Sequence, residues 1–103
     1  MSAYLVGSYR ITNPEGYKPY VPAAVATLLA HGSELLVADY DSQVLEGEPG
    51  NVTIVWKFAS KEAAMAWYNS PEYQAIKHLR TDNTEGTAVL VDRWEPPKQG
   101  ENQ

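Results

Sequence analysis

The side chains with the most versatile chemistry in this sequence are two histidines and a group of polar-tipped aromatic residues. His31 and His78 are poised to titrate near neutral pH, so either could serve as a general base. A tyrosine or tryptophan combines apolar area with one hydrogen-bonding group, which suits recognition of a flat or aromatic ligand. Four such aromatics fall on or beside the predicted helix faces that should meet a sheet, namely Tyr17, Trp67, Tyr68 and Tyr73.

His31 and Tyr73 are the predicted catalytic residues. In this hypothesis His31 takes a proton from a phenol or an α-carbon, and the Tyr73 hydroxyl is the donor. The alternative is that His31 only stabilises the end of a helix, an effect worth about 0.3–1 kcal/mol, and that the aromatics only pack a core or an interface. His78 is interpreted as another helix-end partner. Nothing else in the sequence points to haem, and no cofactor is predicted.

Polar residues near the predicted turns extend the candidate site. Arg10, near the end of the first predicted strand, and Asn13 beside it are expected to orient an anionic ligand. Carboxylates spaced like those of Asp39 and Asp41 can hold a hard cation. A solvated strand end and loop is the ordinary explanation for such carboxylates, and no metal site is predicted.

The composition is that of one acidic globular domain. The chain has 103 residues, of which 44% are apolar and 20% charged, and its net charge is −5 at pH 7. This length corresponds to a single domain. Because there is no run of Lys or Arg, neither nucleic acid nor an anionic membrane surface is expected as a partner.

Cysteine content and hydropathy bear on the compartment. The sequence has no cysteine, which excludes a disulfide framework, a thiolate nucleophile and a Cys-based metal site. The first residues lack the basic and long apolar regions of a signal peptide. No apolar run approaches the roughly 20 residues needed to span a bilayer. A cytoplasmic protein is therefore expected.

The elements that must position these residues are predicted from periodicity. Alternating or continuous apolar segments favour strands over 3–11, 35–41, 52–58 and 86–94. Helical spacing favours helices over 17–30 and from 61 to about 78. Segments 12–16, 42–51 and 80–85 are predicted as turn or loop.

Prolines and glycines refine the two helices. Pro19 and Pro22 are tolerated only in the first turns, so the first helix starts late or has a broken first turn. Gly32 suits the left-handed position that follows a helix. Ser60 is a good N-cap, and Ser70 with Pro71 restarts the second helix after a kink.

The order β-α-β-β-α-β predicts an α+β, ferredoxin-like fold in which two helices cover one face of a four-stranded antiparallel sheet. The other sheet face also carries bulky apolar residues, more than a monomer usually exposes. A second copy packed sheet to sheet would cover them, so a homodimer is predicted. The domain is expected to span residues 1–94, with a loose tail over 95–103.

Several short motifs along the chain resemble one family. They are residues 13–17 (NPEGY), 31–32 (HG), 44–47 (VLEG), 58–60 (FAS) and, most specifically, 66–75 (AWYNSPEYQA). In this order they resemble the domain-of-unknown-function family 1330, a branch of the dimeric α/β-barrel superfamily. The resemblance runs from about Ala3 to Trp94.

The resemblance implies ferredoxin-like protomers that pair sheet to sheet as a dimeric α/β barrel. It also singles out Glu46 as a ligand-binding candidate, because Glu46 and Gly47 belong to the family pattern. Glu46 could alternatively accept backbone N–H bonds and shape its loop. Relatives in the superfamily include cofactor-free monooxygenases, muconolactone-type isomerases, haem enzymes and ligand-sensing domains, and a fold alone does not select among them.

Two hypotheses follow. In the first, the protein is a small-molecule-binding dimer with one pocket per protomer near Tyr17, His31, Trp67 and Tyr73, and any chemistry is cofactor-independent, on an aromatic or lactone-like metabolite. In the second, it is a non-catalytic ligand-sensing or assembly module. A pocket of about 300 Å³ or more that a histidine faces would favour the first hypothesis, and two solvent-facing histidines would favour the second.

Overall fold

The computed structural model describes residues 2–97 of the chain. Its strands form a four-stranded sheet in the order β2-β3-β1-β4, and every neighbouring pair is antiparallel. β1 lies at the centre, where Leu5 pairs with Trp56 of β3 and with Leu90 of β4. The strands are β1 (Ala3–Ile11), β2 (Glu34–Asp39), β3 (Val52–Phe58) and β4 (Thr84–Asp92).

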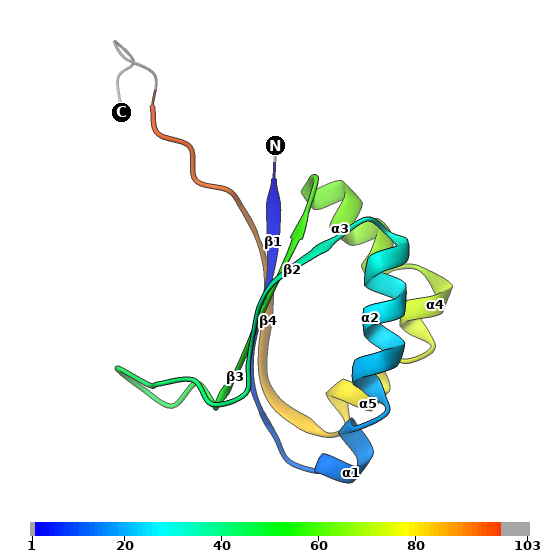
Figure 1. Ribbon diagram of the computed structural model, residues 1–103, viewed down its shortest axis with the longest axis vertical. Helices are drawn as coiled ribbons and strands as arrows, with labels where there is room; N and C mark the ends of the chain where they lie inside the picture. Colours follow the sequence, from blue (N-terminus) through cyan, green and yellow to red (C-terminus); the bar gives the residue numbers. More distant parts are fainter. Residues whose placement is uncertain (1, 98–103) are drawn as a thin grey trace.

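All the helices lie on one side of this sheet (Figure 1). They are α1 (Pro14–Tyr17), α2 (Tyr20–Ala30), α3 (Lys61–Tyr68), α4 (Pro71–Gln74) and α5 (His78–Thr81). Together with the strand order, this layering confirms the predicted ferredoxin-like fold.

The first helical region confirms the expected break and corrects its position. Residues 14–16, predicted as part of a turn, form a short helix together with Tyr17, and the Asn13 side chain caps it. Pro19 is the N-cap of α2, and Pro22 lies in its first turn, where a missing N–H is harmless. At the other end Gly32 follows the helix with a φ of 73°, the left-handed conformation predicted for it.

β2 differs from the predicted alternation. The pairing with β3 contains a bulge between Leu35 and Val37. The extra residue reverses the alternation beyond it, so that Leu35 and Ala38 both face the helices. Tyr40 and Asp41, predicted to be in the strand, follow its end.

The prediction of a loop over residues 80–85 holds only for Asp82 and Asn83. Arg80 and Thr81 close helix α5, and β4 begins at Thr84 and ends at Asp92, two residues earlier at each end than predicted. The reason is local: Asn83 and Thr84 donate side-chain hydrogen bonds to the carbonyls of Leu79 and Arg80, which joins the helix directly to the strand.

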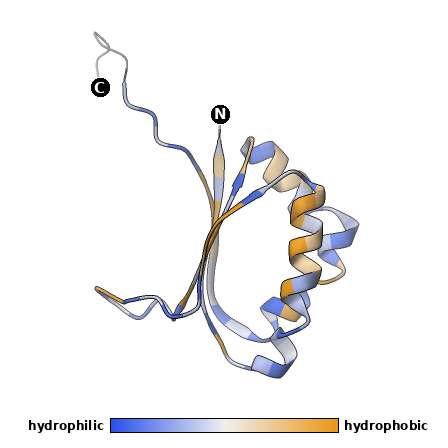
Figure 2. Ribbon diagram, viewed as in Figure 1, coloured by the Kyte–Doolittle hydropathy of each residue, from blue (hydrophilic) through white to orange (hydrophobic). Residues whose placement is uncertain are grey.

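The core lies between the sheet and the helices and is rich in aromatic residues. Figure 2 shows apolar residues gathered along α2 and the middle of the strands, and further apolar residues at the tip of the β2–β3 loop. The largest fully buried side chains are Trp67, Tyr73, Phe58 and Val52. Serine caps hold the helices over them: Ser60 accepts from the Ala63 N–H and Ser70 from the Tyr73 N–H.

The opposite, helix-free face of the sheet keeps apolar side chains exposed, including Val37, Val89 and Val91. The β2–β3 loop and the segment after β4 project from the sheet away from the helices (Figure 1). Leu45 in that loop and Trp94 after β4 are 85% and 76% exposed. Residues 98–103 of the predicted tail lie outside the described residues.

Within residues 2–97, none of the helices is long and apolar enough to cross a membrane. The same part of the chain contains no group of three His, Cys, Asp or Glu side chains arranged to hold a metal ion. Asp39, considered above as a cation ligand, instead accepts a hydrogen bond from the Asp41 N–H at 2.7 Å, which shapes the end of β2.

Candidate functional site

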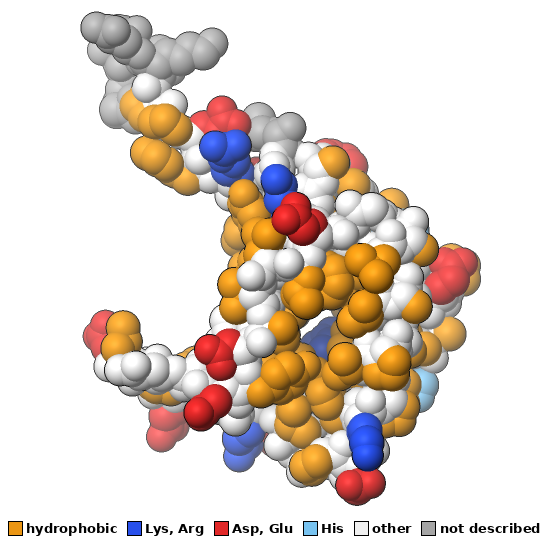
Figure 3. Space-filling model, in the orientation of Figure 1, with side chains coloured by type: hydrophobic (Ala, Val, Ile, Leu, Met, Phe, Trp, Pro, Cys, Tyr) orange, Lys and Arg blue, Asp and Glu red, His pale blue; other side chains and the backbone are white. Residues whose placement is uncertain are grey.

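A cavity of about 210 Å³ separates α2 from the sheet. Gly7 of β1 and Ala88 of β4, which are paired across the two strands, leave room on the sheet side. Apolar side chains of α2 face them across the cavity. The space-filling view shows the hollow ringed by hydrophobic atoms, with a basic group visible in its depth (Figure 3). Further apolar lining residues are Leu5, Val21, Ala24, Val25, Leu28, Leu35, Ala38, Ile54 and Trp56.

Two pairs of tyrosine hydroxyls supply most of the polar lining. The hydroxyls of Tyr9 and Tyr17 lie 2.7 Å apart, and those of Tyr20 and Tyr73 lie 3.0 Å apart. The members of each pair come from different elements, so the pairs join β1 to α1 and α2 to α4. Each pair satisfies one donor and leaves a further donor or acceptor position for a guest molecule.

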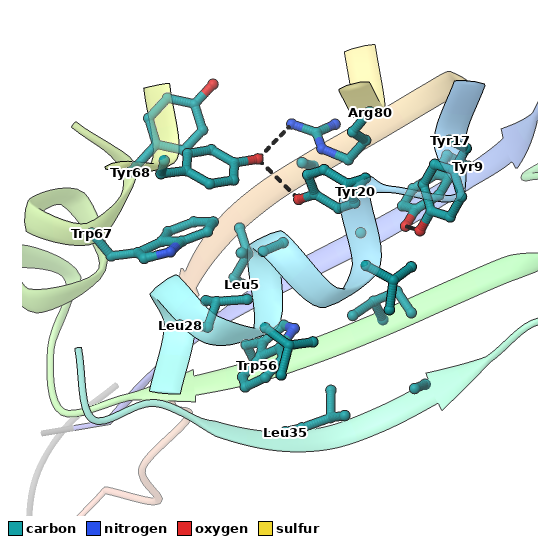
Figure 4. A pocket seen from close by; sticks show the side chains of 18 of the residues that line it. Leu5, Tyr9, Tyr17, Tyr20, Leu28, Leu35, Trp56, Trp67, Tyr68 and Arg80 are labelled. Carbon is teal, nitrogen blue, oxygen red and sulfur yellow. Dashed lines mark hydrogen bonds between the residues drawn. The ribbon is translucent and has the colours of Figure 1, made fainter. Parts of the chain in front are cut away.

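Arg80 approaches the second tyrosine pair. Its guanidinium donates to the Tyr73 hydroxyl at 3.4 Å, and Figure 4 shows Arg80 and Tyr20 meeting at the same hydroxyl group. The side chain is part-buried. Among the cavity-lining residues of the described chain, Arg80 is the single formally charged side chain.

The environment keeps the tyrosines protonated. Burial raises the pKa of Tyr17, and the hydrogen bond from Tyr9 adds to this effect. Burial likewise raises the pKa of Tyr20, reinforced by the neighbouring Tyr73, and the pKa of Tyr9. At neutral pH these three hydroxyls are therefore neutral hydrogen-bonding groups and not proton-abstracting phenolates.

Trp67 fixes the wall formed by the second helical region. Its indole N–H donates to the Thr27 hydroxyl of α2 at 2.9 Å, and its ring lies 4.1 Å from that of Tyr73, centre to centre. Tyr68 completes the aromatic group, 5.5 Å from Tyr73, with the Lys77 ammonium 5.2 Å from its ring. Since the indole N–H is already bonded, Trp67 offers a ligand its ring and not its donor.

The structure brings four of the predicted site residues together. Tyr17, Trp67, Tyr68 and Tyr73 all line the cavity, although they belong to three separate helices. Their shared location makes them candidate binding residues. Their functional roles stay predictions.

His31 does not share that cavity. It is the C-cap of α2, where it is exposed, and it is not among the cavity-lining residues of the described chain. The structure therefore does not bring His31 and Tyr73 into one cavity, because His31 follows the last residue of α2 and faces solvent, and its catalytic role stays a prediction. His78 is exposed as well.

The other predicted polar ligands also lie elsewhere. Arg10 forms an exposed ion pair with Glu85, its partner across β1 and β4. The side-chain oxygen Oδ1 of Asn13 accepts a hydrogen bond from the Gly16 N–H and caps α1. Glu46 is exposed in the β2–β3 loop, which projects away from the helices. These placements contradict a shared pocket for Arg10, Asn13, Glu46 and the tyrosines.

The polar cavity residues that were missed from the sequence are Tyr9, Tyr20, Tyr40 and Arg80. Tyr9 shares the face of its predicted strand with Leu5 and Gly7, which could have identified it. Tyr20 stands between two prolines that obscure the helical spacing. Arg80 lies seven residues after Tyr73, two helical turns on, but this spacing was hidden by the assignment of Arg80 to a loop.

The fold is similar to those of several solved structures. A protein of unknown function from Rhodopseudomonas palustris matches with a TM-score of 0.76 and 13% identity, over 92% of this chain and 84% of that chain. SnoaB, a cofactor-independent oxygenase from Streptomyces nogalater, matches with a TM-score of 0.63 and 8% identity, over 95% and 98% of the respective chains. An uncharacterised NIPSNAP domain protein from Burkholderia xenovorans matches with a TM-score of 0.61 and 17% identity, over 99% and 100%.

At such identities these likenesses show the fold alone. A comparison with functionally curated proteins finds no match. The family model for the domain of unknown function DUF1330 matches residues 2–94, and thus nearly the whole chain, which confirms the resemblance seen in its motifs. This chain therefore belongs to the DUF1330 family.

Proposed function

We propose that this protein binds a small, flat and largely apolar molecule in the cavity between α2 and the sheet. The observation that carries the proposal is the lining itself: apolar walls into which two tyrosine pairs and one guanidinium converge. Such a lining is typical of small-molecule sites, where a few polar groups orient an otherwise apolar ligand.

Native mass spectrometry of the untagged protein from its host cells tests this proposal. The expected result is a reproducible small adduct on the wild-type protein. The control is Ala88→Leu, which fills the cavity beside Gly7 and is expected to remove the adduct. An adduct that persists undiminished in Ala88→Leu, or a wild-type protein free of adducts together with a failed metabolite screen, contradicts the proposal.

The likeness to SnoaB supports cofactor-independent oxidation of an aromatic ligand as the finer proposal. In this protein the groups available to such a reaction are Tyr20, Tyr73 and Arg80, which can donate hydrogen bonds to an oxygen that gains negative charge. Replacing Tyr73 with Phe is then expected to lower turnover of the identified ligand by about 10²-fold, whereas His31→Ala leaves it unchanged. Unchanged turnover in Tyr73→Phe contradicts this assignment.

A non-catalytic ligand-sensing module is the second candidate function. The observation that favours it is the exposure of both histidines, which leaves the cavity without a histidine base among its described lining residues. Incubation of the identified ligand with the protein in air separates the two candidates, because a sensing module returns the ligand unaltered.

We also propose that two copies pair through their helix-free sheet faces. Val37, Val89 and Val91 are exposed there, and the two segments that project on the same side carry exposed Leu45 and Trp94. A second copy would remove this apolar surface from water, and a two-fold axis would bring equivalent patches together.

Sedimentation velocity tests this pairing. The wild-type protein is expected to sediment as a dimer, and Val89→Lys combined with Val91→Lys as a monomer, because lysines on both copies would be buried facing one another. Met65→Lys is the matched control, since it places a lysine at an equally exposed apolar position on the helical side. A monomeric wild-type protein contradicts the proposal.

A further inference from the structure

We infer that the molecule bound in this cavity is a carboxylic acid, held as its carboxylate by Arg80. This inference rests on the proposed function, because it concerns the ligand of the same cavity. It adds a chemical class and an orientation: the anionic end lies at Arg80 and Tyr73, and the apolar body lies between α2 and the sheet.

The first step of the argument is the unmet hydrogen-bonding capacity of Arg80. A guanidinium carries five N–H donors. Within residues 2–97, the side-chain hydrogen bond found for this group is the long one to the Tyr73 hydroxyl, at 3.4 Å. In the same part of the chain, ion pairs join Arg10 to Glu85 and Lys61 to Asp92, and none involves Arg80.

The second step is the environment of that charge. The cavity around Arg80 has apolar walls, and its described lining includes neither Asp nor Glu. A cation drawn out of bulk water into such surroundings loses hydration, and buried charges are normally paired for that reason. Arg80 is therefore suited to bind an anion from outside the described part of the chain.

The third step is the choice among anions. A carboxylate is planar and matches the fork of a guanidinium through two parallel hydrogen bonds. A phosphate carries more charge and is usually met by several cations or by a row of backbone N–H groups, whereas this cavity offers one guanidinium and tyrosine hydroxyls. One cation beside a hydrogen-bonded tyrosine pair, which keeps one free hydroxyl donor, fits one carboxylate.

The tyrosines and small residues define where the rest of the ligand lies. The hydroxyls of Tyr20 and Tyr73 sit beside the guanidinium, and because they share one hydrogen bond, one of the two still has a proton to donate to a carboxylate oxygen. Gly7 and Ala88 then leave a shallow space along the sheet, which suits a flat ring system better than a branched chain.

Binding of two matched probes tests the inference by calorimetry at neutral pH. The probes are naphthalene-2-carboxylate and naphthalene-2-carboxamide, which share one shape and differ in charge. The wild-type protein is expected to bind the carboxylate at least about tenfold more tightly. In Arg80→Gln this preference is expected to vanish, with the affinity for the carboxamide unchanged, and Arg80→Lys is expected to retain part of it.

Arg10→Gln is the control, because it removes an arginine of the same chain that lies outside the cavity. Circular dichroism verifies that each variant is folded. Equal affinity of the wild-type protein for both probes overturns the carboxylate inference and leaves the binding function standing. A preference that survives in Arg80→Gln, or disappears in Arg10→Gln, also overturns it. Binding of neither probe contradicts the proposed binding function itself, and the inference falls with it.

Discussion

At the scale of single residues, this protein depends on tyrosines whose hydroxyls are paired inside the core. Burying a hydroxyl without a hydrogen-bond partner costs free energy. A hydrogen bond between two buried hydroxyls avoids this cost for both of them. The pairs Tyr9–Tyr17 and Tyr20–Tyr73 therefore serve the fold and the cavity at once.

Replacing Tyr17 with Phe is expected to lower the free energy of unfolding by about 0.5–1.5 kcal/mol, because the Tyr9 hydroxyl loses its buried partner. Urea denaturation measures the change. The double variant with Tyr9→Phe is expected to lose less than the sum of the two single losses, since it removes both ends of one bond. Strict additivity contradicts a direct energetic link between these hydroxyls.

The raised tyrosine pKa values predict a loss of stability in alkali. The folded-state pKa values of Tyr9, Tyr17 and Tyr20 lie above the ordinary 10.0. Above that pH the unfolded chain releases these protons while the folded chain keeps them, so unfolding becomes more favourable as pH rises. Their stabilising contribution is complete below pH 10 and is lost progressively above it.

Unfolding by urea at several pH values between about 8 and 11 checks this dependence. The free energy of unfolding is expected to fall above about pH 10, and to fall less steeply in Tyr20→Phe, which lacks one of the three groups. A free energy that stays constant across this range contradicts the prediction.

At the scale of elements, short caps hold the cavity wall in place. Ser70 joins α3 to α4: its hydroxyl donates to the Trp67 carbonyl at 2.7 Å and accepts from the Tyr73 N–H at 3.2 Å. This one buried side chain thereby sets the position of both aromatic residues at the back of the cavity.

Ser70→Ala is expected to cost about 1–2 kcal/mol of unfolding free energy, because it removes both the cap on the Tyr73 N–H and the side-chain hydrogen bond to the Trp67 carbonyl. Ser60→Ala is the matched control at the start of α3, because Ser60 is only part-buried and its hydroxyl serves only as the N-cap. Its replacement is expected to cost about 1 kcal/mol of unfolding free energy. Only Ser70→Ala should also shift the tryptophan fluorescence. Equal effects of the two changes contradict the positioning role of Ser70.

The β2–β3 loop is attached to the sheet through a glycine. Gly50 has a φ of 85°, and a Cβ there would lie 2.5 Å from the backbone of Tyr9. Gly32 has a similar φ of 73° but open space around it. Gly50→Ala is therefore expected to destabilise the protein by at least about 1 kcal/mol more than Gly32→Ala in thermal denaturation. Equal losses contradict the close approach.

At the scale of the whole molecule, binding and stability compete for the same space. The cavity of about 210 Å³ holds apolar surface that the sheet and α2 could otherwise bury against each other. Ala88→Leu is expected to raise the free energy of unfolding by about 0.5–2 kcal/mol while abolishing ligand binding. Thermal denaturation checks the first effect, and a loss of stability shows that position 88 has no room for the larger side chain.

The sequence by itself determined the fold class and most of the elements. Alternation over Ala3–Ile11 and a largely continuous apolar run over Val52–Phe58 predicted those two strands with the bounds that the structure has. The serine and proline signals at Ser60, Ser70 and Pro71 placed the helix starts, because they satisfy N–H groups locally. Four aromatic members of the site, Tyr17, Trp67, Tyr68 and Tyr73, were also predicted, as large side chains on faces that meet the sheet.

Only the tertiary structure decided which polar groups enter the cavity. His31 and Arg10 were equally plausible from sequence, yet one ends a helix in solvent and the other pairs with Glu85 across the strands. Arg80 enters because a short helix joins β4 directly and brings it beside Tyr73. Such placements depend on contacts between residues that are distant in sequence, and a local sequence pattern carries no information about those contacts.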